Sequence, residues 1–259
     1  MSKARQHNEE DLRRIIRNNR WVLRLSRGWL VIVLGFLFVY TGLSLTAPFL
    51  MRAGYEGAAD IVYKIYGPLC HQFAFRSVFF FGEQTFYPRA IAGSDLGSFE
   101  FYAASDPAFA GIDLSVWSAD LQLTARAFKG NETMGYKAAL CERDIAIYAT
   151  MFVMGLLFLR VRRWLRPAPL WLYLILGLAP MGLDGFSQLF SYPPFEFWPV
   201  RETLPPFRVL TGALFGLMNV WLAFPYLEMS MNDTIESIGA KLDAAQQRLT
   251  ALESKRQAR

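Results

Sequence analysis

The sequence predicts an all-α polytopic membrane protein with four transmembrane helices, cytoplasmic N and C termini, an extracytoplasmic loop-rich cap and a C-terminal amphipathic helix. Three observations support this fold class. The 259 residues are 53% hydrophobic and 15% aromatic but only 19% charged, which is a charge-poor composition for a water-soluble globule. The apolar residues gather in runs about as long as the roughly 20 residues that cross a bilayer. Basic residues outnumber acidic ones on one side of those runs only.

A basic leader, residues 1–28, precedes the first span. It holds eight Lys or Arg residues and three acids. Its apolar residues, among them Leu12, Ile16 and Leu23, alternate with arginines, which favours a helix lying on the inner membrane surface or a plain solvated leader. The first span, about 29–50, carries no charge. It is expected to be an uncleaved anchor, because the leader is long for a signal peptide and no small-residue cleavage site follows.

Three further spans are expected at about 140–161, 168–190 and 208–228, which gives a membrane domain of residues 29–231. The turn between the second and third spans holds four arginines and no acid, whereas the long segment 52–139 between the first two spans is acid-rich. Basic residues are retained on the cytoplasmic side. The chain is therefore predicted to be a multi-pass protein of the plasma (inner) membrane, with both termini inside and residues 52–139 outside.

The outer segment is expected to begin with an amphipathic helix, Ala53 to Tyr66. The aromatic stretch Phe73 to Phe81 should then pack on the outer ends of the spans. Tyr87 to Gly135 is rich in Gly, Ser, Asp and Ala, which is typical of a loop-rich cap with a few short helices.

Residues 232–259 form a predicted cytoplasmic helix. Its apolar residues fall three and four positions apart over about three heptads, which fits a short coiled coil for self-association or a membrane-protein partner. A single amphipathic helix folded back on the membrane is the alternative. Besides the lipid bilayer and such a partner, no nucleic acid is expected, because the net charge of +5 is explained by cytoplasmic arginines facing anionic lipid.

Polar residues at membrane depth mark a candidate site. Asp184 in the third span costs roughly 2.5–3.5 kcal/mol to insert if it lies near the bilayer centre, so it needs a partner. Gln188 shares its helix face, one turn further on. Arg208, at the same end of the fourth span, is the expected counter-ion of Asp184. Cys70, Arg76 and Arg143 map to the same outer rim, so four segments converge there.

The ordered motifs Cys70-His71-Gln72, Leu140-Cys141-Glu142-Arg143, Asp184-Gly185-x-x-Gln188 and Arg208-x-x-Thr211-Gly212 resemble those of an uncharacterised family of prokaryotic integral membrane proteins, catalogued as a domain of unknown function. The resemblance spans roughly Gly67 to Leu227 and implies a small multi-span protein without an established activity. That family usually has Cys-x-Arg-Cys where this chain ends in Asp144. The cap resembles an insertion between its motifs.

The two cysteines allow three interpretations. A Cys70–Cys141 disulfide would close a long loop in an oxidising compartment. Cys70, His71, Cys141 and Asp144 could instead bind a metal, with zinc as the suitable ion. Two reduced, packed thiols are the third possibility.

Two classes of function stay open, and whether the chain is an enzyme depends on which holds. A membrane enzyme acting on a lipid or lipid-linked substrate would use three tentative catalytic residues, His71, Asp184 and Arg208. Substrate contacts would come from Gln72, Arg76, Arg143, Gln188 and Thr211. In a non-catalytic accessory or assembly subunit, the same motifs would be structural, as a disulfide and buried ion pairs. Transport ranks last, because one acid in four spans offers little for an ion path.

Overall fold

The computed structural model describes residues 3–257, with the side chains of residues 9–255. Residues 1–2 of the predicted leader and 258–259 of the predicted C-terminal segment lie outside the described residues. Four segments are long and apolar enough to cross a bilayer: Glu9–Arg52, Glu142–Val161, Leu170–Leu189 and Pro205–Lys255. The prediction of an α-helical polytopic membrane protein is confirmed.

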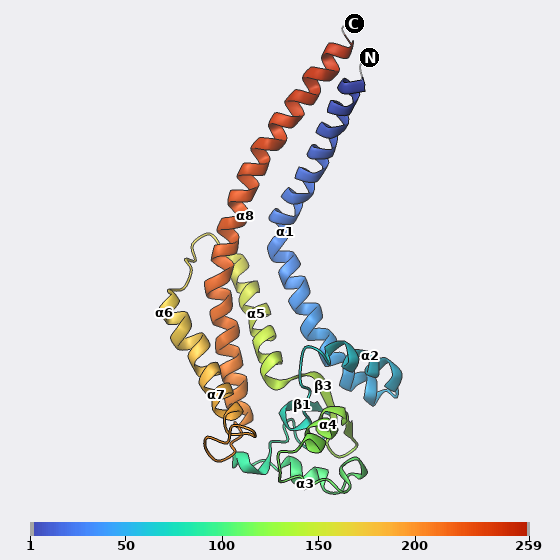
Figure 1. Cartoon of the computed structure of the whole chain (residues 1–259), viewed down its shortest axis with the longest axis vertical. Helices are drawn as coiled ribbons and strands as arrows, with labels where there is room; N and C mark the ends of the chain where they lie inside the picture. The colour runs from blue at the N-terminus through green and yellow to red at the C-terminus, as the bar shows by residue number, and fades with distance from the viewer. Residues whose placement is uncertain (1–2, 258–259) are drawn as a thin grey trace.

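Three long elements form the bundle. Helices α1 (Lys3–Arg52) and α8 (Pro205–Gln257) run side by side, and α5 (Glu142–Val161) packs against both. The third span is composite, with α6 (Leu170–Leu172), a π-helical stretch η4 (Tyr173–Leu178) and α7 (Ala179–Leu189). Both chain ends lie at one end of the bundle and the cap lies at the other, as an even number of spans requires (Figure 1).

The leader and the C-terminal segment depart from two expectations. The leader does not lie flat on a membrane surface, because it continues into the first span as one helix, α1. Its apolar stripe, including the buried Ile16 and Leu23, lies against α8, and Arg13 pairs with Glu253 at 2.7 Å. Likewise the C-terminal segment is not folded back, since it continues α8. Each stripe buries its apolar face against the other helix rather than against lipid.

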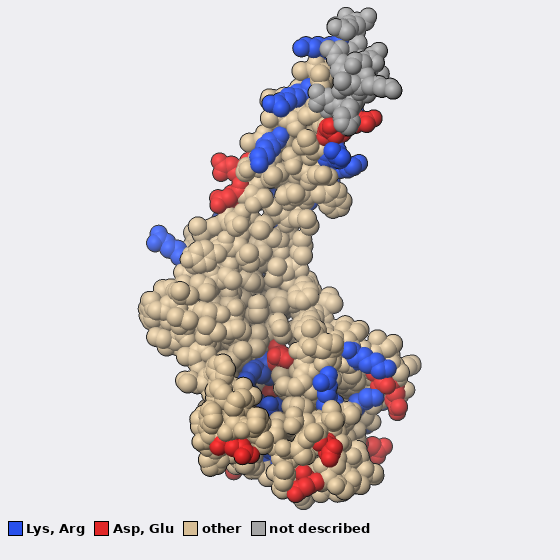
Figure 2. Space-filling view, in the orientation of Figure 1, with Lys and Arg blue, Asp and Glu red and all other residues tan. Residues whose placement is uncertain are grey.

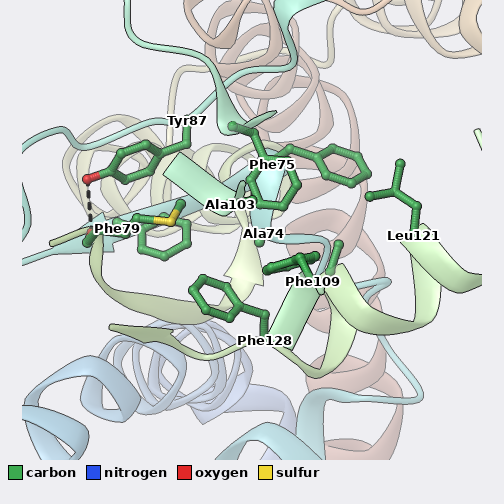
Figure 3. Packing of buried hydrophobic residues seen from close by; sticks show 11 residues of the cluster. Ala74, Phe75, Phe79, Tyr87, Ala103, Phe109, Leu121 and Phe128 are labelled. Carbon is green, nitrogen blue, oxygen red and sulfur yellow. Dashed lines mark hydrogen bonds between the residues drawn. The ribbon is translucent and has the colours of Figure 1, made fainter. Parts of the chain in front are cut away.

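The cap contains short elements only. They are α2 (Glu56–Tyr66), η1 (Ala74–Arg76), β1 (Ser77–Phe80), η2 (Ala90–Ala92), α3 (Phe99–Ala103), η3 (Pro107–Phe109), α4 (Ala119–Ala127), β2 (Gly130–Asn131) and β3 (Gly135–Cys141). The expected helix within Ala53 to Tyr66 is present as α2. A core of aromatic side chains holds these pieces together (Figure 3), and the Tyr87 hydroxyl donates to the Met134 carbonyl at 3.1 Å.

A small antiparallel sheet, in the order β1-β3-β2, was not predicted. The aromatic stretch supplies β1, and the central strand β3 supplies the connection to the membrane. Ser77 lies opposite Cys141, at the point where β3 ends and α5 begins. The sheet therefore fixes the start of the second span against the turn that follows α2.

Lys137 fastens this sheet to the rest of the cap. Its side chain is 1% exposed, and its ammonium group donates to the backbone carbonyls of Ala125 at 3.2 Å and Arg126 at 2.8 Å, and also to that of Gln72. Burial lowers the pKa of the Lys137 ammonium to about 7. A lysine with this pKa changes its charge between neutral and alkaline pH.

We expect the stability of the protein to rise as the pH is raised from about 7 towards 10. In that window the unfolded lysine still binds its proton while the folded lysine has lost it, so unfolding takes up a proton. Stability then increases with pH, by at most about 1.4 kcal/mol per pH unit. Lys137→Met should flatten this rise in thermal unfolding followed in detergent. Lys64→Met, which changes an exposed lysine of α2, should leave it unchanged.

Candidate functional site

The site begins at the junction between β3 and α5. Cys141 ends the strand and caps the helix, where its Sγ accepts a hydrogen bond from the Asp144 N–H at 3.5 Å. Cys70 lies in the turn after α2, and its Sγ accepts from the Cys141 N–H at 3.2 Å. Sγ of each cysteine and a carboxylate oxygen of Asp144 all lie within 4.8 Å of one another. The two sulfur atoms are not bonded to each other in the structure.

Glu202, in the loop before α8, is the centre of the largest ion-pair cluster. Its carboxylate accepts from Arg76 at 2.8 Å, from Gln188 at 3.2 Å and also from Arg208 and the Tyr192 hydroxyl. The side chain is only 2% exposed. Burial alone would raise the pKa of the Glu202 carboxyl, but the guanidinium groups of Arg76 and Arg208 outweigh burial and lower it. Glu202 is therefore a buried carboxylate anion.

Asp184 has different partners from those expected. Its carboxylate pairs with Arg143 from α5, with Arg201 at 3.4 Å, and accepts from the Thr203 hydroxyl. Among the described residues no ion pair joins Asp184 to Arg208, so the expected counter-ion is corrected. Arg208 pairs instead with Glu202 and, at 3.4 Å, with Glu142. The loop between the third and fourth spans folds back over the bundle and brings acids and bases of its own.

A cavity of about 270 Å³ opens beside these ion pairs. It is lined by Leu69, Cys70, His71, Arg76, Cys141, Glu142, Arg143, Asp144, Gln188 and Arg208. Figure 2 shows basic and acidic side chains gathered in a hollow between the bundle and the cap. The convergence of four segments at this rim was expected from the sequence, and the structure shows it as one cavity.

Four buried polar atoms of residues that line this cavity have no hydrogen-bond partner among the described residues. They are Nε of Arg76, Nε of Arg143, Nε of Arg208 and Oε1 of Glu142. An unpaired buried donor or acceptor costs roughly 1–3 kcal/mol. Oε1 of Glu142 still lies 3.4 Å from Nη1 of Arg208, as an ion pair without a hydrogen bond. Three unused N–H donors around one cavity match a ligand that has several acceptor oxygens.

Arg76 also joins the cap to the bundle. Its guanidinium carbon lies 5.4 Å from the Trp117 ring centroid and 5.9 Å from that of Tyr192. These two rings stack at 4.0 Å, although Trp117 belongs to the cap and Tyr192 follows α7. The aromatic rings exclude water from Arg76, which strengthens its pairing with Glu202.

Three predicted site residues, Gln72, Asp184 and Thr211, do not line this cavity, and a fourth, His71, lines it outside the cysteine cluster. Gln72 is buried and donates to the carbonyls of Tyr63 at 3.0 Å and Ala139 at 2.9 Å, so it holds α2 to β3 outside the cavity. Thr211 donates to the Arg208 carbonyl at 3.2 Å and lines a neighbouring hollow with Asp184. His71 lines the main cavity but is not in the cluster of Cys70, Cys141 and Asp144.

His71 is neutral in this environment. Its Nδ1 accepts from the Phe73 N–H at 3.2 Å, which requires an unprotonated nitrogen. Burial and the nearby positive charges, first that of Arg76, lower the pKa of His71 well below its ordinary value. In this neutral form the proton is on Nε2, which can donate a hydrogen bond to a ligand in the cavity.

Glu142, Tyr192, Arg201, Glu202 and Thr203 were not among the predicted site residues. A charge balance offered one signal: three bases at the rim, Arg76, Arg143 and Arg208, were assigned a single acid, so further buried acids were required. Glu142 was visible beside Cys141, and Glu202 lies in the short loop before the fourth span.

Residues 123–222 match the model of a family described as "Predicted membrane protein (DUF2085)". The resemblance expected from the motifs is confirmed over this segment, which holds Cys141, Asp184 and Arg208, while Cys70 and His71 precede it. No curated protein and no solved structure matches the chain.

Within the DUF2085 segment lie both acids that pair with Arg208, namely Glu142 and Glu202, and also Asp184 with its partners. The residues before the segment add Arg76 and one of the two cysteines. The cavity is therefore formed jointly by the segment that matches the family model and by the preceding part of the chain.

Proposed function

We propose that the rim cavity binds the phosphate-bearing head group of a lipid or lipid-linked molecule on the outer side of the plasma membrane. The observation that carries the proposal is the set of unpaired buried Nε–H groups of Arg76, Arg143 and Arg208 around one cavity. Phosphate oxygens are strong acceptors for guanidinium N–H groups. A hydroxyl of a monoprotonated phosphate would donate to Oε1 of Glu142, which accepts no hydrogen bond from the described residues.

Cavity size and position support a head group rather than a whole lipid. About 270 Å³ is at the lower end of the volumes of small-molecule sites. Arg143 and Glu142 begin α5, and Arg208 lies in the first turn of α8, so the cavity is at the ends of the spans, where head groups lie. The catalytic role proposed for neutral His71 is then to donate from its Nε2–H to the bound group, because Nδ1 already accepts from the Phe73 N–H.

Arg143→Lys is the most informative variant for this proposal. Arginine 143 has a 19% exposed side chain, and lysine keeps the positive charge for Asp184 while removing the guanidinium donors. Detergent-purified protein should bind phosphatidic acid but not diacylglycerol in native mass spectrometry. The variant should bind at least tenfold more weakly, which corresponds to about 1.4 kcal/mol or more.

Arg160→Lys provides a matched control, because Arg160 is exposed at the other end of α5. It should bind like the unmodified protein. Inorganic phosphate bound as tightly as phosphatidic acid would assign the site to a free phosphate-bearing ligand instead of a lipid. Equal binding of phosphatidic acid by the protein and Arg143→Lys, or no binding at all, would contradict the proposal.

A second candidate function is that of an accessory or assembly subunit. Helices α1 and α8 continue as a pair beyond the membrane bundle, by roughly 40 Å for residues 3–28. On this pair Trp21 is 57% exposed and Leu25 is 55% exposed, which favours contact with another protein or a second copy through the cytoplasmic helices. Light scattering of the full chain and of a chain ending at Asn232 tests this. Equal protomer numbers in the two would exclude self-association through residues 232–259.

A further inference from the structure

Cys70, Cys141 and Asp144 form a group of metal ligands within the cavity wall. Their ligand atoms lie within 4.8 Å of one another, close to the spacing that one tetrahedral ion imposes. Cys141 and Asp144 are three residues apart, at the N-cap and in the first turn of α5, so they share a face. Cys70 approaches from the turn after α2. Two separate segments therefore bring three ligands to one point.

The surroundings of the two sulfur atoms suit thiolates bound to a cation. Each sulfur already accepts a backbone N–H, from Cys141 and Asp144 respectively, and Cys141 caps the 20-residue helix α5. Backbone donors and the positive end of a helix both stabilise negative sulfur.

Asp144 is the carboxylate that the ion pairs leave unused. Glu142, Asp184 and Glu202 all pair with arginines, whereas none of the ion pairs among the described residues includes Asp144. It is partly exposed to the cavity, and none of its neighbours competes with a metal for it by an ion pair. A carboxylate left without a base beside two thiols has the chemistry of a ligand.

The cavity next to this group provides room for a further ligand. All three residues line the 270 Å³ cavity, so a ligand in the cavity can reach an ion held between them. Three protein ligands with an open fourth position are the arrangement of catalytic rather than structural zinc sites.

We propose that Cys70, Cys141 and Asp144 hold one zinc ion whose fourth position faces the arginine-lined cavity. Two thiolates exclude Mg²⁺ and Ca²⁺, which take oxygen ligands, and favour a softer cation. The ion would place a Lewis acid in the wall of the cavity that the guanidinium groups also line, where a water molecule or an oxygen of a bound ligand would complete its coordination. This metal site rests on its own ligands and does not depend on binding of a head group.

Metal content of the full chain, purified in detergent with reductant and zinc and then desalted, tests the site directly. We expect elemental mass spectrometry to find about one zinc ion per chain. Cys70→Ser, Cys141→Ser and Asp144→Asn should each lose most of it. Asp95→Asn is the matched control, because it makes the same change as Asp144→Asn at an exposed acid of the cap outside the ligand group, and it should keep its zinc.

Cobalt substitution of the unmodified protein gives a test that needs no variant to fold. Cobalt bound to two thiolates should give a sulfur-to-metal charge-transfer band in the near ultraviolet. The proposal would be overturned if the purified protein contained no zinc and gave no such band with cobalt. A Cys70–Cys141 disulfide in protein isolated without reductant would also overturn it. Binding of phosphatidic acid is measured again after the metal has been removed by a chelator. Because the two sites are tested by separate measurements, failure of one proposal does not imply failure of the other.

Discussion

Replacement of Glu202 by alanine is expected to unfold most of the protein at temperatures at which the unmodified chain is stable. The change leaves Arg208, whose side chain is 4% exposed, and Arg76, at 14%, without the carboxylate between them. Removing one partner of a buried ion pair costs about 3–5 kcal/mol, because the remaining charge is buried and uncompensated. The midpoint of thermal unfolding in detergent should fall by well over ten degrees or the folded form should be lost.

Glu202→Gln separates charge from shape. Glutamine keeps the volume and can still accept hydrogen bonds from Arg76 and Tyr192, so an intermediate loss is expected. Glu132→Ala removes an exposed acid of the cap and should change stability by less than about 0.5 kcal/mol. If Glu202→Ala unfolds like Glu132→Ala, the carboxylate does not hold the rim together.

Acid should weaken the same cluster. The pKa of Glu202 is lowered from its ordinary value of 4.5, so around and below that pH the unfolded state binds a proton that the folded state does not. Stability must then fall as the pH drops. This part of the acid sensitivity should be absent from Glu202→Gln.

The spans and the polar rim could be predicted from the sequence because both depend on composition along one segment. A run without charges is visible in one dimension, and so is an acid such as Asp184 within it. The choice of partner is not. Arg208 contacts Glu202 and Glu142 rather than Asp184. The loop of residues 190–204 supplies Glu202, whose place beside Arg208 depends on the path of that loop in three dimensions.

The small sheet escaped prediction for a local reason. Strand β3 is buried along most of its length, with Ala138, Ala139 and Leu140 fully inaccessible, so it lacks the alternation that identifies a half-exposed strand. Its residues were assigned to the cap and to the start of the second span. Similarly, the amide of Gln72 is a group that could contact a ligand, but it donates to two backbone carbonyls. That role depends on the position of β3.

Gly216 and Gly212 set the distance between α8 and α5, and thus the position of the site residues on both helices. A Cβ at Gly216 would lie 2.5 Å from the Ile147 carbonyl oxygen, and one at Gly212 would lie 2.8 Å from that of Arg143. Both contacts are with backbone, which cannot rotate away. Small residues four positions apart are the usual means by which membrane helices approach closely.

Gly216→Ala is therefore expected to destabilise the protein by about 1–3 kcal/mol, the usual cost of overpacking, although alanine favours a helix. Gly239→Ala makes the same change in the same helix, where a Cβ meets nothing within 4 Å, and should stabilise by about 0.5–1 kcal/mol. One substitution would thus have opposite signs at two positions of α8. Thermal unfolding of the two variants in detergent measures the contrast.

The effect at Gly216 should extend to the cavity. Pushing α8 away from α5 separates Arg208 from Glu142, which are 3.4 Å apart and belong to different helices. Binding of phosphatidic acid should then weaken in Gly216→Ala, while zinc content should persist, because all three proposed zinc ligands lie outside α8. Equal stability of Gly216→Ala and Gly239→Ala would mean that the two helices are not held at this distance. If Gly216→Ala lost its zinc as well as its binding of phosphatidic acid, the two sites would instead be structurally coupled.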